Sequence, residues 1–72
     1  MEYVISLSWD ADVNVWIATS EDIPGLVLES GSYDALVERL RSAVPELLEL
    51  NSTQHIPLNL LLKSERNLRV SY

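Results

Sequence analysis

The chain has 72 residues, no cysteine and a net charge of −6. A chain of this length buries only about 60% of its unfolded surface, so we expect residues 1–72 to form a single small domain. Without cysteines, neither disulfides nor thiolate zinc sites can stabilise it, which leaves an oligomer interface for that role. Apolar runs are far shorter than the roughly 20 residues that span a bilayer, and no basic signal segment opens the chain. These features predict a cytoplasmic protein.

Charge is distributed unevenly along the chain. All five basic residues lie after position 38, whereas eight of the eleven acids lie before position 39. Such a chain should be repelled by the phosphates of nucleic acids and attracted to basic proteins. The alternative is that the acids only keep a small apolar domain soluble. We therefore expect no direct nucleic-acid binding, no membrane partner, and a basic protein as the class of partner that the charge favours.

Two strands joined by a hairpin are predicted at the start of the chain. Tyr3–Trp9 alternates with a period of two, which is typical of a half-buried strand. Asp10–Asn14 is rich in residues that form turns, so Val15–Thr19 is expected to run antiparallel to the first strand. Both faces of this second strand carry apolar residues, and either face is a candidate for the core.

The third and fourth predicted strands are separated by most of the chain. Pro24-Gly25 predicts a turn, after which Leu26–Glu29 forms a short third strand. Much later, a polar loop at Ser52–His55 precedes a fourth strand from Ile56 to Leu62.

The most regular pattern lies between Ser32 and Asn51. Its apolar residues recur at spacings of three and four, as on one stripe of an amphipathic helix. Ser32 is suited to cap the first turn, and Asn51 can take the left-handed conformation that ends a helix. Pro45 costs about 3 kcal/mol inside a helix; we predict one helix kinked there, with two short helices in line as the alternative. The stripe consists of Tyr33, Leu36, Val37, Leu40, Val44, Leu47 and Leu48.

The predicted fold class is α+β with the element order β-β-β-α-β. A helix that returns the chain to the same sheet makes the last strand parallel to the strand it joins. If that neighbour is the first strand, the result is a four-stranded mixed sheet of order 3-2-1-4 with the helix on one face. The other face has no cover, and Val4 and Leu61 with Trp9 or Trp16 would make it an association surface.

An ordered set of segments resembles the HicB-like antitoxins. The set consists of Val15–Ala18, Asp22–Leu26, Glu29 and the capped helix ending in Val44–Asn51, and the resemblance covers Glu2–Arg69. It implies a partial ribonuclease-H-like fold, and the chain looks most like a short, uncharacterised branch of this superfamily. Typical members add a C-terminal DNA-binding module. Only ten residues follow Leu62 here, so we expect a single HicB-like domain without such a module.

The resemblance also implies a function. HicB-like antitoxins bind and silence a small basic RNA-cleaving toxin of the HicA type, and we expect this chain to act in the same way by occluding the toxin. The alternative is a self-associating structural or small-molecule-binding dimer that has no toxin partner. The residues expected at the partner contact are Asp10, Asp12, Trp16, Glu21 and Asp22.

A homodimer is expected under either interpretation, because a 72-residue sheet with an uncovered face buries too little surface alone. The candidate interfaces are the open face and the C-terminal tail. Strand character resumes in the tail, which can add a strand to the edge of a neighbouring sheet. The interface residues expected are Leu61, Arg66, Leu68, Val70 and Tyr72.

Catalytic and ligand-binding motifs are weak. The first and fourth strands lack the carboxylates with which a ribonuclease-H-like enzyme binds metal ions. Asp10 and Asp12 are better explained as turn residues than as cation ligands, since they lack the order of a calcium loop. His55 has no orienting carboxylate or nucleophile near it in the sequence, and Gly25 and Gly31 do not form a phosphate-binding loop. We predict a protein that is not an enzyme and has no metal or cofactor.

Overall fold

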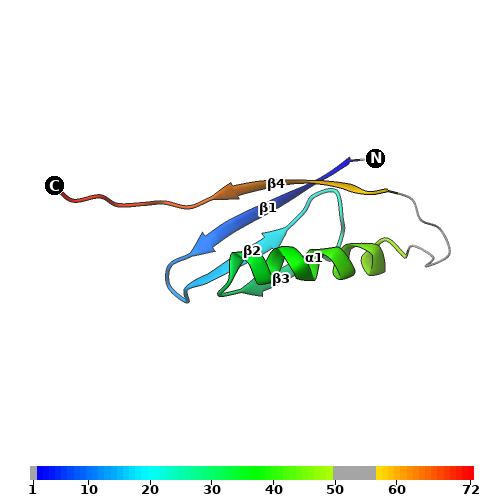
Figure 1. Cartoon of the computed structure of the whole chain (residues 1–72), viewed down its shortest axis with the longest axis horizontal. Coiled ribbons are helices and arrows are strands. Elements are labelled where there is room, and N and C mark those ends of the chain that lie inside the picture. The colour runs from blue at the N-terminus through cyan, green and yellow to red at the C-terminus, as the bar shows by residue number, and fades with distance from the viewer. Residues whose placement is uncertain (1, 50–56) are drawn as a thin grey trace.

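The computed structural model describes residues 2–49 and 57–72, and it confirms the predicted α+β fold (Figure 1). The strands form one four-stranded sheet of order β3-β2-β1-β4. The β1–β2 and β2–β3 pairs are antiparallel, and the β1–β4 pair is parallel. In chain order, the described elements are β1 (Glu2–Asp10), β2 (Val15–Thr19), β3 (Val27–Ser30), α1 (Tyr33–Leu47) and β4 (Asn59–Glu65).

The strand register decides which face of the sheet α1 covers. Leu7 lies opposite Ala18, and Ile5 lies opposite Leu62. The face of β2 that carries Ala18 and Trp16 is therefore the covered face, a choice that the sequence left open. The core on this side consists of Ile5, Leu7, Ala18, Ile23, Leu26, Leu36, Leu40 and Val44.

The start and the middle of α1 agree with the sequence. The Ser32 hydroxyl accepts a hydrogen bond from the Ala35 N–H at 3.2 Å, which satisfies one of the free donors of the first turn. The helix continues through Pro45 as one element, which confirms a single helix over two short ones. Pro45 lies in the last turn, and the Leu48 N–H still bonds to the Val44 carbonyl at 3.0 Å.

The end of α1 differs from the prediction. The helix ends at Leu47, and Glu49, with a φ of 55°, takes the left-handed conformation. Asn51 lies outside the described residues, as do the predicted loop at Ser52–His55 and the strand residue Ile56. No helix within residues 2–49 and 57–72 is long and apolar enough to cross a membrane.

The hairpin between β1 and β2 is held by local polar groups. The Asp10 carboxylate accepts a hydrogen bond from the Asp12 N–H at 3.0 Å. Asn14 has a φ of 55°, which asparagine tolerates better than most residues. Both observations agree with the turn predicted for this segment.

The C-terminal tail leaves the sheet instead of continuing it. Residues 66–72, which we call the arm, extend beyond β4 (the red end of the chain in Figure 1), and the molecule is 54 Å long but only about 20 Å in its other dimensions. Leu68 and Val70 are 79% and 71% exposed, and Tyr72 is fully exposed. The strand predicted here is therefore not part of this chain's own sheet. β4 pairs with β1 only as far as the Glu65–Ser8 pair, and β1 ends two residues later.

Candidate partner-binding surface

The sheet has a covered face and an open face. Side chains of β1 alternate, so Ser6 and Ser8 point away from the core formed by Ile5 and Leu7. The residues of β2 and β4 that lie opposite these β1 residues, and the β3 residues opposite those of β2, point to the same open face. The open face consists of Glu2, Val4, Ser6, Ser8, Asp10, Val15, Ile17, Thr19, Val27, Glu29, Asn59, Leu61, Lys63 and Glu65.

The open face combines small polar residues with isolated aliphatic ones. Serine and threonine occupy its centre, and Val27 and Leu61 are 70% and 42% exposed. The prediction that Val4 and Leu61 lie together is confirmed, since they are directly opposite each other. The prediction that a tryptophan joins them is wrong, because Trp9 and Trp16 alternate onto the covered face. The result is a mixed polar and apolar surface.

The four acids predicted at the partner contact border the open face at its two opposite ends. Asp10 and Asp12 lie at the β1–β2 hairpin, whereas Glu21 and Asp22 follow β2 at the other end. The β1 residues between these ends span about 20 Å. Each pair lines a shallow hollow, of about 420 Å³ at the hairpin and about 450 Å³ beside Glu21. The structure therefore brings the pairs to one face without bringing them together.

The charge of this face is strongly one-sided. Lys63 is the single basic residue on the open face as defined above, because Arg39 and Arg41 project from α1 and Arg66 lies over the Trp9 ring at 4.4 Å. An acidic surface of this kind attracts a cationic partner over several ångströms and orients it. The acids on the face and at its ends are Glu2, Asp10, Asp12, Glu21, Asp22, Glu29 and Glu65.

Asp22 has a structural role that the sequence did not reveal. Its carboxylate accepts a hydrogen bond from the Val4 N–H at 2.7 Å. The Ser20 hydroxyl donates to the Val4 carbonyl at 2.6 Å and accepts from the Asp22 N–H at 3.1 Å. β2 pairs with β1 only as far as Thr19, which lies opposite Ser6, so these two side chains replace the missing β2 partner of Val4. Glu21 has no such role in the described bonds and is the better candidate for a partner contact.

Trp16 lies on the covered face, on the opposite side of the sheet from the open face that the four acids border. Its half-buried ring packs edge-to-face between Trp9 and Tyr33, with centroid distances of 5.5 and 5.1 Å. The Tyr33 hydroxyl lies 2.7 Å from the Ser64 hydroxyl, and Arg66 stacks on Trp9. We call these five residues the aromatic cluster. It ties α1 to the end of β4, so Trp16 and Arg66 have structural roles here.

The predicted dimer-interface residues fall on different surfaces. Leu61 belongs to the open face, and Arg66 belongs to the aromatic cluster on the covered side. Leu68, Val70 and Tyr72 lie in the exposed arm. One chain therefore does not gather them into one patch, although all five follow one another along β4 and the arm.

The described residues offer binding groups but little chemistry. Within residues 2–49 and 57–72, no group of three or more His, Cys, Asp or Glu side chains could hold a metal ion. All fully buried residues in this part of the chain are apolar. The acids predicted at the partner contact lie on the open face or line the shallow hollows at its ends. His55, weighed above as a general base, lies outside the described residues.

The fold and the acidic open face can be compared with known proteins. A family described as a domain of unknown function (DUF1902) matches residues 2–72, and the chain belongs to this family. A hypothetical protein from the extremely thermophilic bacterium Thermus thermophilus has a similar crystal structure, with a TM-score of 0.78 and 35% sequence identity. That match covers 97% of this chain and 100% of the other. A comparison with curated proteins finds no match.

Proposed function

We propose that this domain is a non-catalytic protein-binding module of the HicB-like type, which neutralises a small basic RNA-cleaving protein of the HicA type by occlusion. The single observation that carries this proposal is the charge of the open face. Seven carboxylates lie on that face or at its ends, against one lysine. The element order agrees with the partial ribonuclease-H-like fold that the HicB resemblance implies.

Electrostatics gives the mechanism. A protein that grips RNA presents cationic surface to phosphates, and the same surface is attracted to an acidic sheet face. Both acid pairs border that face at its opposite ends, so a partner that contacts both would be oriented as well as attracted. Exposed aliphatic residues such as Val27 and Leu61 would add apolar contact area between the charged ends.

Co-expression with the product of the adjacent gene tests this proposal, with complex formation and RNA cleavage by that product as the two readouts. We expect a stable complex and suppressed cleavage. Glu21→Lys should slow association and weaken its dependence on salt, because rim charges act mainly on the association rate. Glu46→Lys makes the same charge change on exposed α1, away from the open face, and should have little effect.

Two outcomes would contradict the proposal. One is the absence of a complex and of any effect on cleavage. The other is an equal loss of binding in Glu21→Lys and Glu46→Lys. Such a result would show that binding depends on the net charge of the chain and not on the open face. Asp22 is unsuitable for this test because its carboxylate bonds to the Val4 N–H.

The second candidate function is a self-associating dimer without a toxin partner. The exposed arm favours it, since Leu68, Val70 and Tyr72 have no cover in the single chain. Dimerisation and binding of a basic protein use different surfaces and can coexist. If the chain dimerises but binds no basic partner, only this second function remains.

A further inference from the structure

A groove lies between α1 and β4 on the covered face. It has a volume of about 420 Å³ and is lined mostly by apolar side chains. α1 approaches β2 and β3 most closely, so the leucines of the β4 side remain only half-buried. Those leucines are Leu58, Leu60 and Leu62.

The arm carries the complementary pattern. Leu68, Val70 and Tyr72 alternate with the polar residues Arg69 and Ser71, which is the pattern of a strand with one apolar face. Arg66 already stacks on Trp9 on the covered side, so the alternation of β4 continues into the arm. By that alternation the three apolar arm residues lie on the same side as the half-buried leucines.

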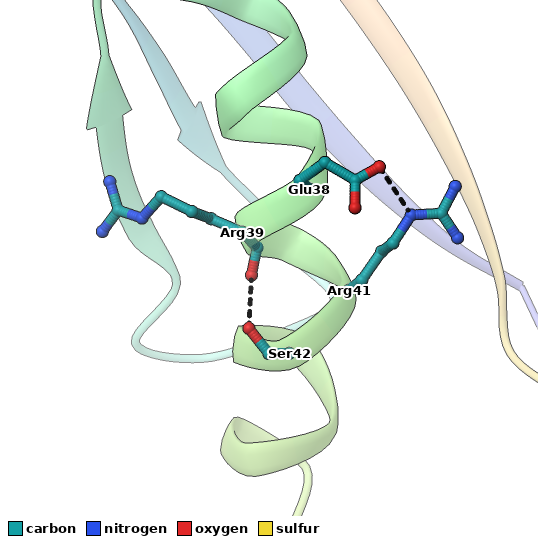
Figure 2. Close-up of polar contacts among 4 residues, drawn as sticks. All are labelled: Glu38, Arg39, Arg41 and Ser42. Carbon is teal, nitrogen blue, oxygen red and sulfur yellow. Dashed lines mark hydrogen bonds and ion pairs between the residues drawn. The ribbon is translucent and has the colours of Figure 1, made fainter.

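The two edges of the sheet differ in their availability. At the β3 edge, the Arg39 guanidinium donates a hydrogen bond to the Glu29 carbonyl at 2.9 Å. Figure 2 shows Arg39 leaving α1 toward β3, whereas Arg41, paired with Glu38 at 3.1 Å, leaves toward β4. β3 is only four residues long, while β4 has seven, and β4 pairs with β1 on one side only. An open edge of this kind accepts another strand.

We propose that the arm of a second copy pairs antiparallel with β4 and closes the groove, and that the two copies exchange arms about a two-fold axis through Glu65. In this register Leu68, Val70 and Tyr72 lie opposite Leu62, Leu60 and Leu58 of the second copy.

Length and symmetry both support this register. β4 and the arm have seven residues each, and in this register arm residues 66–72 lie opposite residues 64–58, so the arm spans β4 and reaches Leu58 just before it. A two-fold axis perpendicular to the sheet keeps the covered faces of both copies on one side, which requires even-numbered residues to face even-numbered residues. Such an exchange is closed and does not propagate into a fibre. The result is one eight-stranded sheet with the two β4 strands at its centre.

The charges at the centre are compatible with this pairing. Glu65 meets the Glu65 of the second copy, but Lys63 of each chain lies diagonally beside it on the same face. Asn67 lies opposite Lys63, and Arg69 lies opposite Leu61. The inference does not depend on a basic partner, because the open face remains accessible.

Cysteine cross-linking tests the register, since the chain has no cysteine of its own. Single Ser64→Cys, Glu65→Cys and Arg66→Cys variants are oxidised and the covalent dimer is followed on non-reducing gels. We expect Glu65→Cys to cross-link at least about tenfold faster than the other two, because only position 65 meets itself and a paired thiol has a millimolar effective concentration. Val27→Cys, exposed at the β3 edge, sets the collisional background. Equal rates at all four positions would overturn the inference.

Sedimentation of the full chain tests the apolar contact. Leu68→Asp/Val70→Asp should weaken dimerisation about a hundredfold or more, because two buried apolar side chains are replaced by charges. The resulting monomer should lose only the strand signal of the paired arm from its circular dichroism and should still unfold in one cooperative transition, since the arm contributes no strand to its own sheet. Asn67→Asp/Ser71→Asp adds the same charge on the other face of the same arm and should weaken dimerisation only a few-fold. A wild-type monomer at high micromolar concentration, or equal loss in both variants, would overturn the inference.

Discussion

The two halves of the covered face, one over β2 and β3 and the other over β4, differ in how completely α1 covers them. A helix is about 10 Å wide and neighbouring strands lie about 4.8 Å apart, so one helix covers about two of four strands. α1 lies over β2 and β3, where the core is closed and Arg39 occupies the sheet edge. Over β4, the same covered face ends in a groove with half-buried leucines. Equally apolar sequences thus become a core on one side and an available surface on the other.

The largest expected effect is a loss of stability, which we compare between the half of the covered face under α1 and the half beside β4. Leu40→Ala removes a fully buried side chain of α1 and should lower the free energy of unfolding by about 2–5 kcal/mol. Leu62→Ala shortens a half-buried groove residue and should cost only about 1 kcal/mol. Urea denaturation of both variants measures the difference. Both variants carry Leu68→Asp/Val70→Asp as well, so that dimerisation does not contribute to the measured free energy of unfolding. Equal losses would show that the groove is as well packed as the core.

The next prediction concerns the end of the β1–β2 pair. Asp22→Ala leaves the Val4 N–H without its acceptor. This should destabilise the domain by about 1–2 kcal/mol, because a hydrogen bond to a charged group stabilises more than one between neutral groups. Glu21→Ala, one residue earlier, should change stability by less than about 0.5 kcal/mol. Hydrogen exchange of the Val4 amide provides a local readout, and unchanged protection in Asp22→Ala would contradict the role assigned to this carboxylate.

The smallest expected effect lies in the aromatic cluster, where α1 meets β4. Tyr33→Phe removes the hydroxyl that bonds to Ser64, at a cost of about 0.5–1 kcal/mol because the bond is exposed to solvent. Ser64→Ala should cost a similar amount. The double variant should then lose less than the sum of the two, as expected for a shared bond. Strict additivity in this cycle would mean that the two hydroxyls do not interact.

The sequence alone determined the elements and their order. Ser32 was predicted as the helix cap and it caps α1, because its bond is made within one turn. The alternation of Tyr3–Trp9 and the turn residues at Asp10–Asn14 predicted the hairpin, since both patterns act over a few residues. The crossing helix predicted that the last strand runs parallel to its neighbour, and the order 3-2-1-4 followed on the condition that this neighbour is the first strand.

Only the tertiary structure decided what depends on residues distant in sequence. Val15–Thr19 is apolar on both faces, so its covered face was set by pairing Ala18 with Leu7. That pairing also places Trp16 on the covered face. The role of Asp22 depends on an N–H that lies 18 residues earlier, and no local pattern in the sequence marks it. The groove and the closed β3 edge depend on where one helix lies across four strands, which is settled by packing and not by any segment alone.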